Sequence, residues 1–159
     1  MKKAITPLAL LACAVLFASG CSNTGAVIVT GLRVELTGVE RTDGGAVTVS
    51  WRLINPNVTP YLLAEVTNRI FVNGTLVGTT LDRDPMGLPA NGQAAKASQL
   101  VLAGPAAAQM LATAPGTANY RVESDLVIQI YGNQIEKGSL TNSGTVAITG
   151  KEKGGTGCP

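Results

Sequence analysis

The sequence predicts an all-β domain, a two-sheet antiparallel β-sandwich of about seven strands with one short helix. Between residues 26 and 150, apolar residues alternate with polar ones more often than they recur at helical spacing. Turn residues interrupt this alternation at intervals typical of antiparallel sheets. Two dipeptides, Asp43-Gly44 and Asn73-Gly74, favour the tight turns of β-hairpins. These observations predict a sandwich of the immunoglobulin or fibronectin type III kind.

Residues 1–20 are typical of a cleavable signal peptide. Met1 to Lys3 supply positive charge, Ile5 to Phe17 form an apolar stretch, and small residues lead to Gly20 and Cys21. This segment resembles the signal and lipobox of bacterial lipoproteins. The resemblance implies cleavage between Gly20 and Cys21 and attachment of lipid to the Cys21 sulfur. The alternatives are an uncleaved span, which is short against the roughly 20 apolar residues required, and an ordinary secretory signal with an incidental cysteine.

Lipidation of Cys21 would hold the protein permanently on a membrane. Each buried methylene contributes about 0.8 kcal/mol, so two or three acyl chains do not dissociate on a useful timescale. Ser22 follows the cysteine, which resembles the signal for transfer to the outer membrane. We therefore expect a protein of the cell envelope, lipid-anchored in the outer membrane and facing the periplasm, with residues 21–25 as a short linker.

The first predicted strands follow this linker. Leu32, Val34 and Leu36 share one face, and Gly38 marks a change of face that predicts a β-bulge. The clearest strand is 47–53, in which valines, Trp51 and leucine alternate with polar residues. Trp51 is therefore expected in the core.

Asn73-Gly74 gives the strongest local prediction. Both residues tolerate positive φ, so a two-residue turn would join two antiparallel strands. The turn would pair Val72 with Thr75, Phe71 with Leu76 and Ile70 with Val77.

The remaining elements are a strand over residues 94–103, a helix over 105–112 with Pro105 in its first turn, and a strand over 120–131. Gly132-Asn133 then predicts a turn into a last strand that ends near Ile148. The predicted domain spans residues 26–150. Residues 151–159 lack an apolar face and are expected to be disordered.

Composition argues against several classes of function. The chain has no histidine, the side chain most used for proton transfer and for binding metals. Removing Lys2 and Lys3 with the signal leaves ten basic residues against ten acidic ones, and aromatic content is 4%, so a nucleic-acid partner is not expected. We predict no catalytic residue, metal, cofactor or small-molecule substrate, and we expect a protein that is not an enzyme. Cys158 is expected to be free, with an intermolecular disulfide as the alternative.

Three short motifs could carry chemistry, and each has a simpler interpretation. Asp82-Arg83-Asp84 is expected to be a solvated loop, with a calcium or acid–base site as the alternative. Lys96-Ala97-Ser98 places a lysine and a serine on one strand face but supplies no pocket. Asn55-Pro56-Asn57 ends a strand because proline cannot donate to a ladder, and a ligand site made by the two asparagine amides is the alternative.

Several of these features occur in an order that resembles one known family. They are the segments 49–57, 70–78, 88–92, 122–128 and 145–148. Their order resembles that of the late embryogenesis abundant (LEA) type 2 family, also called the water stress and hypersensitive response (WHy) domain. The resemblance covers residues 31–149 and rests on turn motifs that are individually common.

The resemblance implies a non-enzymatic role in protection against desiccation and water stress, exercised at the envelope. The membrane, through the N-terminal lipid, would be the first partner, and client proteins or lipid would be the second. The competing hypothesis is an envelope adaptor that binds protein or lipid through a sheet edge or the end loops.

Overall fold

The computed structural model describes residues 29–42, 44–114, 116–130 and 134–150. Several predicted features lie outside the described residues. They are the signal peptide, Gly20, Cys21, the linker over 21–25, the turn at Gly132-Asn133 and the tail over 151–159.

The described chain is mostly β-strand with one helix, which confirms the all-β class. In chain order the elements are β1 (Arg33–Arg41), β2 (Val47–Asn55), β3 (Tyr61–Val72), β4 (Thr75–Asp82), β5 (Met86–Leu88), β6 (Gly92–Gln99), β7 (Val101–Leu102), α1 (Pro105–Thr113), β8 (Gly116–Gln129) and β9 (Ile135–Gly150).

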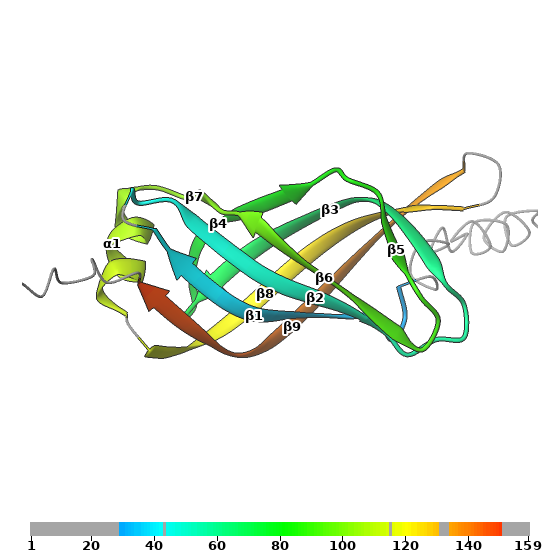
Figure 1. Cartoon of the computed structure of the whole chain (residues 1–159), viewed down its shortest axis with the longest axis horizontal. Helices are drawn as coiled ribbons and strands as arrows, with labels where there is room; N and C mark the ends of the chain where they lie inside the picture. Colours follow the sequence, from blue (N-terminus) through cyan, green and yellow to red (C-terminus); the bar gives the residue numbers. More distant parts are fainter. Residues whose placement is uncertain (1–28, 43, 115, 131–133, 151–159) are drawn as a thin grey trace, which may run out of the picture.

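The strands form one curled sheet, where the sequence predicted two antiparallel sheets. The order is β6-β2-β1-β9-β8-β3-β4-β7, with β5 paired to β3. The last residues of β9, 148–150, pair in parallel with residues 39–41 of β1. This parallel contact joins strands β6, β2 and β1 to the rest of the sheet. On its other side β9 pairs with β8, and that pairing is antiparallel. The sheet curls into a half-barrel in which β2 and β6 cross in front of β8 and β3 (Figure 1).

The core fills the concave side of this sheet. Inward-facing residues alternate along the strands, and β2 shows the pattern most regularly, with Val49, Trp51 and Leu53 fully buried. Val122, Leu126 and Ile128 of β8 belong to the same cluster. Trp51 is fully buried, so its predicted core position is confirmed. Full burial of each such side chain contributes about 2 kcal/mol.

Two local predictions can be compared with the register. The bulge in β1 is confirmed, because the pairing with β2 shifts between Leu36 and Gly38. In the β3–β4 hairpin, Val72 pairs with Thr75 and Phe71 with Leu76 as predicted. The third predicted pair is wrong, since a second bulge moves Ile70 opposite Gly78.

The predicted strand over 94–103 is divided between the two edges of the sheet. β6 pairs with β2, whereas β7 pairs with Gly78 and Thr79 of β4. The chain therefore crosses from one edge to the other at Leu100, which is buried. We call the line between β4 and β6 the seam. At one end of the seam, β7 pairs with β4 through backbone hydrogen bonds. Along the rest of the seam, β4 and β6 are not paired with each other.

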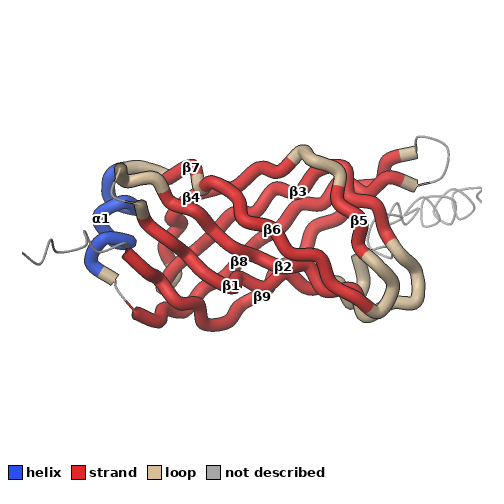
Figure 2. Tube along the Cα trace, in the orientation of Figure 1, coloured by secondary structure: helices blue, strands red, loops and turns tan. Residues whose placement is uncertain are grey.

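The two ends of the half-barrel are covered differently (Figure 2). At one end lies α1, which buries Ala107 and Leu111. Arg41 Nη1 donates to the carbonyl oxygen of Leu111 at 3.2 Å. At the other end lie the β2–β3 and β5–β6 loops. No helix within the described ranges is both long and apolar enough to cross a bilayer.

Candidate functional site

Polar side chains form a row inside the half-barrel, on three neighbouring strands. Asn68 of β3 lies opposite both Thr80 of β4 and Ser124 of β8 in the sheet register. Asn68 Nδ2 donates to Thr80 Oγ1 at 3.1 Å, and Ser124 Oγ donates to Asn68 Oδ1 at 2.6 Å. All three residues are buried. Each therefore has a hydrogen-bond partner inside the protein, as burial requires.

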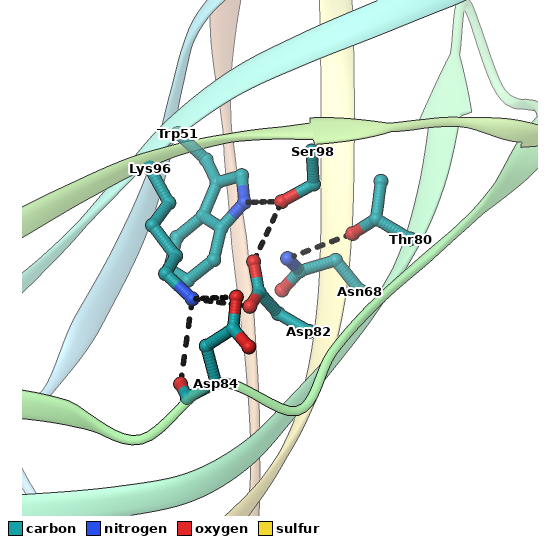
Figure 3. A network of polar contacts seen from close by, with 7 residues as sticks. All are labelled: Trp51, Asn68, Thr80, Asp82, Asp84, Lys96 and Ser98. Carbon is teal, nitrogen blue, oxygen red and sulfur yellow. Dashed lines mark hydrogen bonds and ion pairs between the residues drawn. The ribbon is translucent and has the colours of Figure 1, made fainter.

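A second polar group lies across the seam, and we call it the seam network (Figure 3). It comprises Trp51, Asp82, Asp84, Lys96 and Ser98. The indole Nε1 of Trp51 donates to Ser98 Oγ at 3.0 Å, and Ser98 Oγ donates to Asp82 Oδ2 at 2.9 Å. Trp51 belongs to β2, Ser98 to β6 and Asp82 to β4, so these bonds connect strands on opposite sides of the seam.

Lys96 completes the network. Its Nζ forms an ion pair and hydrogen bond with Asp82 Oδ1, donates to the carbonyl oxygen of Asp84 at 3.3 Å and lies 3.6 Å from Asp84 Oδ2. The side chains of Lys96 and Asp82 are 24% and 12% exposed, whereas that of Asp84 is 92% exposed. The bond between Lys96 and Asp82 is therefore the protected one, and Asp84 contributes a solvated contact.

The position of Asp82 changes its titration. Burial alone would raise the pKa of Asp82, but hydrogen bonds from Lys96 and Ser98 and the positive charge of Lys96 outweigh burial. The pKa of Asp82 consequently lies below its ordinary value of 3.8. The carboxylate is thus held ionised, which suits an acceptor of hydrogen bonds and not a general acid near neutral pH.

The chemistry of the seam network is structural. The Ser98 hydroxyl accepts one hydrogen bond and donates another, so its proton is committed to Asp82. The Lys96 ammonium is paired with the same carboxylate. The network links β6 to β4 by side chains where the backbone does not. Among the described residues, no three His, Cys, Asp or Glu side chains form a group able to hold a metal ion.

The network unites two motifs that the sequence presents separately. Asp82 and Asp84 were expected in a solvated loop, and this description holds for Asp84 only. On β4, Leu81 faces outward at 48% exposure while Thr80 and Asp82 face inward. An inverted alternation of this kind indicates a strand whose interior is polar.

The Asn55-Pro56-Asn57 motif lies where the β2–β3 loop meets the β5–β6 loop. Asn55 is buried, and its Nδ2 donates to the carbonyl oxygens of Thr59 at 2.8 Å and Pro89 at 3.0 Å. Its Oδ1 accepts from the backbone N–H of Asn57 at 2.9 Å, which forms an Asx-turn. Both polar atoms of the Asn55 side-chain amide are therefore bonded within the protein.

The predicted Asn73-Gly74 turn lies between β3 and β4. Asn73 and Gly74 form the β3–β4 turn with φ of 48° and 84°, as a two-residue hairpin turn requires. Asn73 is also tied to β8, because its N–H donates to the carbonyl oxygen of Asn119 at 2.9 Å.

Comparison with known proteins assigns the chain to no family. No family profile and no curated protein matches it. A solution structure from Arabidopsis thaliana is 16% identical with a TM-score of 0.49, covering 77% of this chain and 81% of that one. A solution structure named as a candidate LEA protein is 11% identical with a TM-score of 0.48, covering 76% and 72%. A crystal structure of a protein from Archaeoglobus fulgidus is 16% identical with a TM-score of 0.44, covering 74% and 95%.

Proposed function

We propose that this protein is a non-enzymatic, lipid-anchored component of the cell envelope, with an LEA type 2-like domain that protects nearby proteins or lipid when water is withdrawn. The sequence resemblance supplies the role, and the lipobox at Cys21 supplies the location. The half-barrel takes the place of the immunoglobulin-like sandwich in this proposal.

The observation that supports the role best is that the polar side chains of the interior row and of the seam network bond to one another. Asn68, Ser98 and Asp82 bond to other side chains of the protein. A core whose polar groups bond to one another does not depend on bulk water to satisfy them. Such a domain keeps its shape while the surrounding water is removed, which a protective protein must do.

A drying assay tests the role. A client enzyme dried and rehydrated with the purified protein should retain more activity than with an equal mass of an unrelated protein. Cells lacking the gene should survive drying, freezing and osmotic shock less well. A Cys21→Ser variant is the matched control, because it should protect the enzyme in solution and fail to restore survival in cells. Unchanged survival together with an unprotected client enzyme would refute the role.

An adaptor at the same location is the second candidate. In the described sheet β6 has a backbone partner on one side only, and an edge strand can accept a peptide as an added strand. A reproducible crosslink from β6 to one envelope protein in intact cells would favour the adaptor, and its absence would favour the protective role.

A further inference from the structure

Four segments that carry no charge meet at the end of the half-barrel opposite α1. The segments are residues 29–32, 54–64, 85–95 and the facing ends of β8 and β9, residues 126–130 and 134–135. Hydrogen bonds hold the first three together: Asn57 Nδ2 donates to the carbonyl oxygen of Thr30 at 3.0 Å, and Asn91 N–H donates to that of Asn57 at 2.9 Å. We call this surface the uncharged end. Its nearest charges in sequence are Arg33, Arg52, Glu65, Asp84, Lys96, Asp125 and Glu136.

The uncharged end also exposes large apolar side chains. Val58 is 82% exposed, Ile135 is 60% exposed and Leu62 is 41% exposed, and these are three of the six exposed large hydrophobic residues of the described chain. Leu62 pairs with Gln129, and Gln129 pairs with Ile135. Leu62 and Ile135 therefore lie at one level of the sheet on its outer face, while Val58 projects from the adjoining loop.

The chain enters the described fold at this same end. Val29 precedes β1, and the first residue of β1, Arg33, pairs with Ile54 near the end of β2. The start of β1 and the β2–β3 loop lie at the same end of the half-barrel (Figure 1). From Cys21 to Val29 a fully extended chain spans at most about 29 Å. The β9 strand, with 16 residues, is about 53 Å long. A lipid on Cys21 would therefore bring the uncharged end to the bilayer more readily than any other part of the domain.

We propose that the uncharged end docks on the lipid bilayer, with Val58, Leu62 and Ile135 in the boundary between headgroups and acyl chains. This inference rests on the proposed lipid anchor. Uncharged loops enter that boundary without the cost of desolvating an ion, and exposed aliphatic side chains gain free energy there. Because the segments lack lysine and arginine, docking does not depend on anionic headgroups or on low salt.

Two exposed valines at opposite ends provide a matched pair of probes. Val101 of β7 is 72% exposed, beside α1. The full chain, acylated in cells and carrying Cys158→Ser, would have either Val58→Cys or Val101→Cys labelled with the fluorophore NBD. Each protein would be reconstituted into vesicles of phosphatidylcholine alone and of phosphatidylethanolamine with phosphatidylglycerol. Mass spectrometry and flotation would verify acylation and attachment in every sample.

The label at residue 58 should emit at shorter wavelength and be quenched by dithionite several-fold more slowly than the label at residue 101, in both lipid mixtures and at both low and high salt. Equal quenching of the two labels on an acylated protein that floats with the vesicles would overturn the docking and leave the anchor intact. A protein without acyl chains on Cys21 would overturn the anchor and the docking together.

Discussion

At the scale of single residues, Asp82 shows how one buried carboxylate holds two strands together. It accepts from Ser98 and from Lys96, both on β6, while lying itself at the end of β4. A group whose pKa is lowered by folding stabilises the folded state above its unfolded pKa. That stabilisation is lost as the pH falls through the lower, folded pKa.

An Asp82→Asn substitution should therefore lower the free energy of unfolding at neutral pH by about 2 kcal/mol, because it leaves the Lys96 ammonium without its protected partner. The difference from the natural protein should shrink as the pH falls below 3.8, and it should be lost as the pH falls through the lower, folded pKa, where Asp82 itself takes up a proton. Denaturant titrations at a series of pH values measure this difference.

Asp84→Asn is the control for this prediction, because the same change two residues away removes only a contact with an exposed carboxylate. It should leave stability nearly unchanged. A destabilisation by Asp82→Asn that stays constant down to the lowest pH would contradict the assigned role of the charge.

The sequence identified the residues of the seam network without placing them together. Lys96 and Ser98 share a strand face by simple alternation, and this was predictable. Their contact with Asp82 depends on which two strand edges face each other, and residues 14 and 16 apart in sequence give no local signal of that. The role of Asn55 was easier to predict from the sequence, because an asparagine before Pro56 favours a turn that its own side chain stabilises.

At the scale of elements, Gly78 controls how β7 joins β4. A Cβ added at Gly78 would collide with the carbonyl oxygen of Val101 and would lie 2.9 Å from Leu100 Cγ. This close approach lets the chain cross the seam immediately after β6. Glycine at this position is therefore a packing requirement, since its φ is not in the positive region.

Gly78→Ala should destabilise the protein by about 1–3 kcal/mol, because the backbone of β7 must move to admit the methyl group. Gly87→Ala on β5 is the matched control, since a Cβ there meets no atom within 4 Å. Thermal unfolding of the two variants, with amide hydrogen exchange at Leu102, measures the effect. Equal stability of the two variants would show that β7 does not need the close approach.

Sequence patterns predicted long elements well and short ones poorly. Strand β2 and helix α1 were predicted because alternation and an N-terminal proline are local signals. β5 and β7 have three and two residues, too few for any period to be visible. The Ile70 pairing was missed because a bulge changes register without changing composition.

At the scale of the whole molecule, alternation predicts which face of a strand is buried but not which strands are neighbours. A two-sheet sandwich and a curled single sheet impose the same inward and outward pattern on β2 or β8. The parallel contact between β1 and β9 distinguishes them here, and it involves only residues 39–41 and 148–150. The all-β class was therefore predictable, and the half-barrel was not.

The two ends of the half-barrel suggest how the domain is oriented relative to the membrane. α1 closes one end, and the uncharged end lies where the chain enters the fold. In the proposed arrangement the uncharged end faces lipid, and the seam and α1 face the aqueous space. This orientation, and any protection at the envelope, depends on the proposed lipid anchor at Cys21.

Mass spectrometry of the protein purified from its native membrane tests that anchor most directly. We predict an N-terminal peptide that begins at Cys21 and carries two or three acyl chains, and a Cys21→Ser variant that lacks them and leaves the membrane fraction. A native protein that retains Met1, or that begins at an unmodified Cys21, would contradict the proposed lipid anchor.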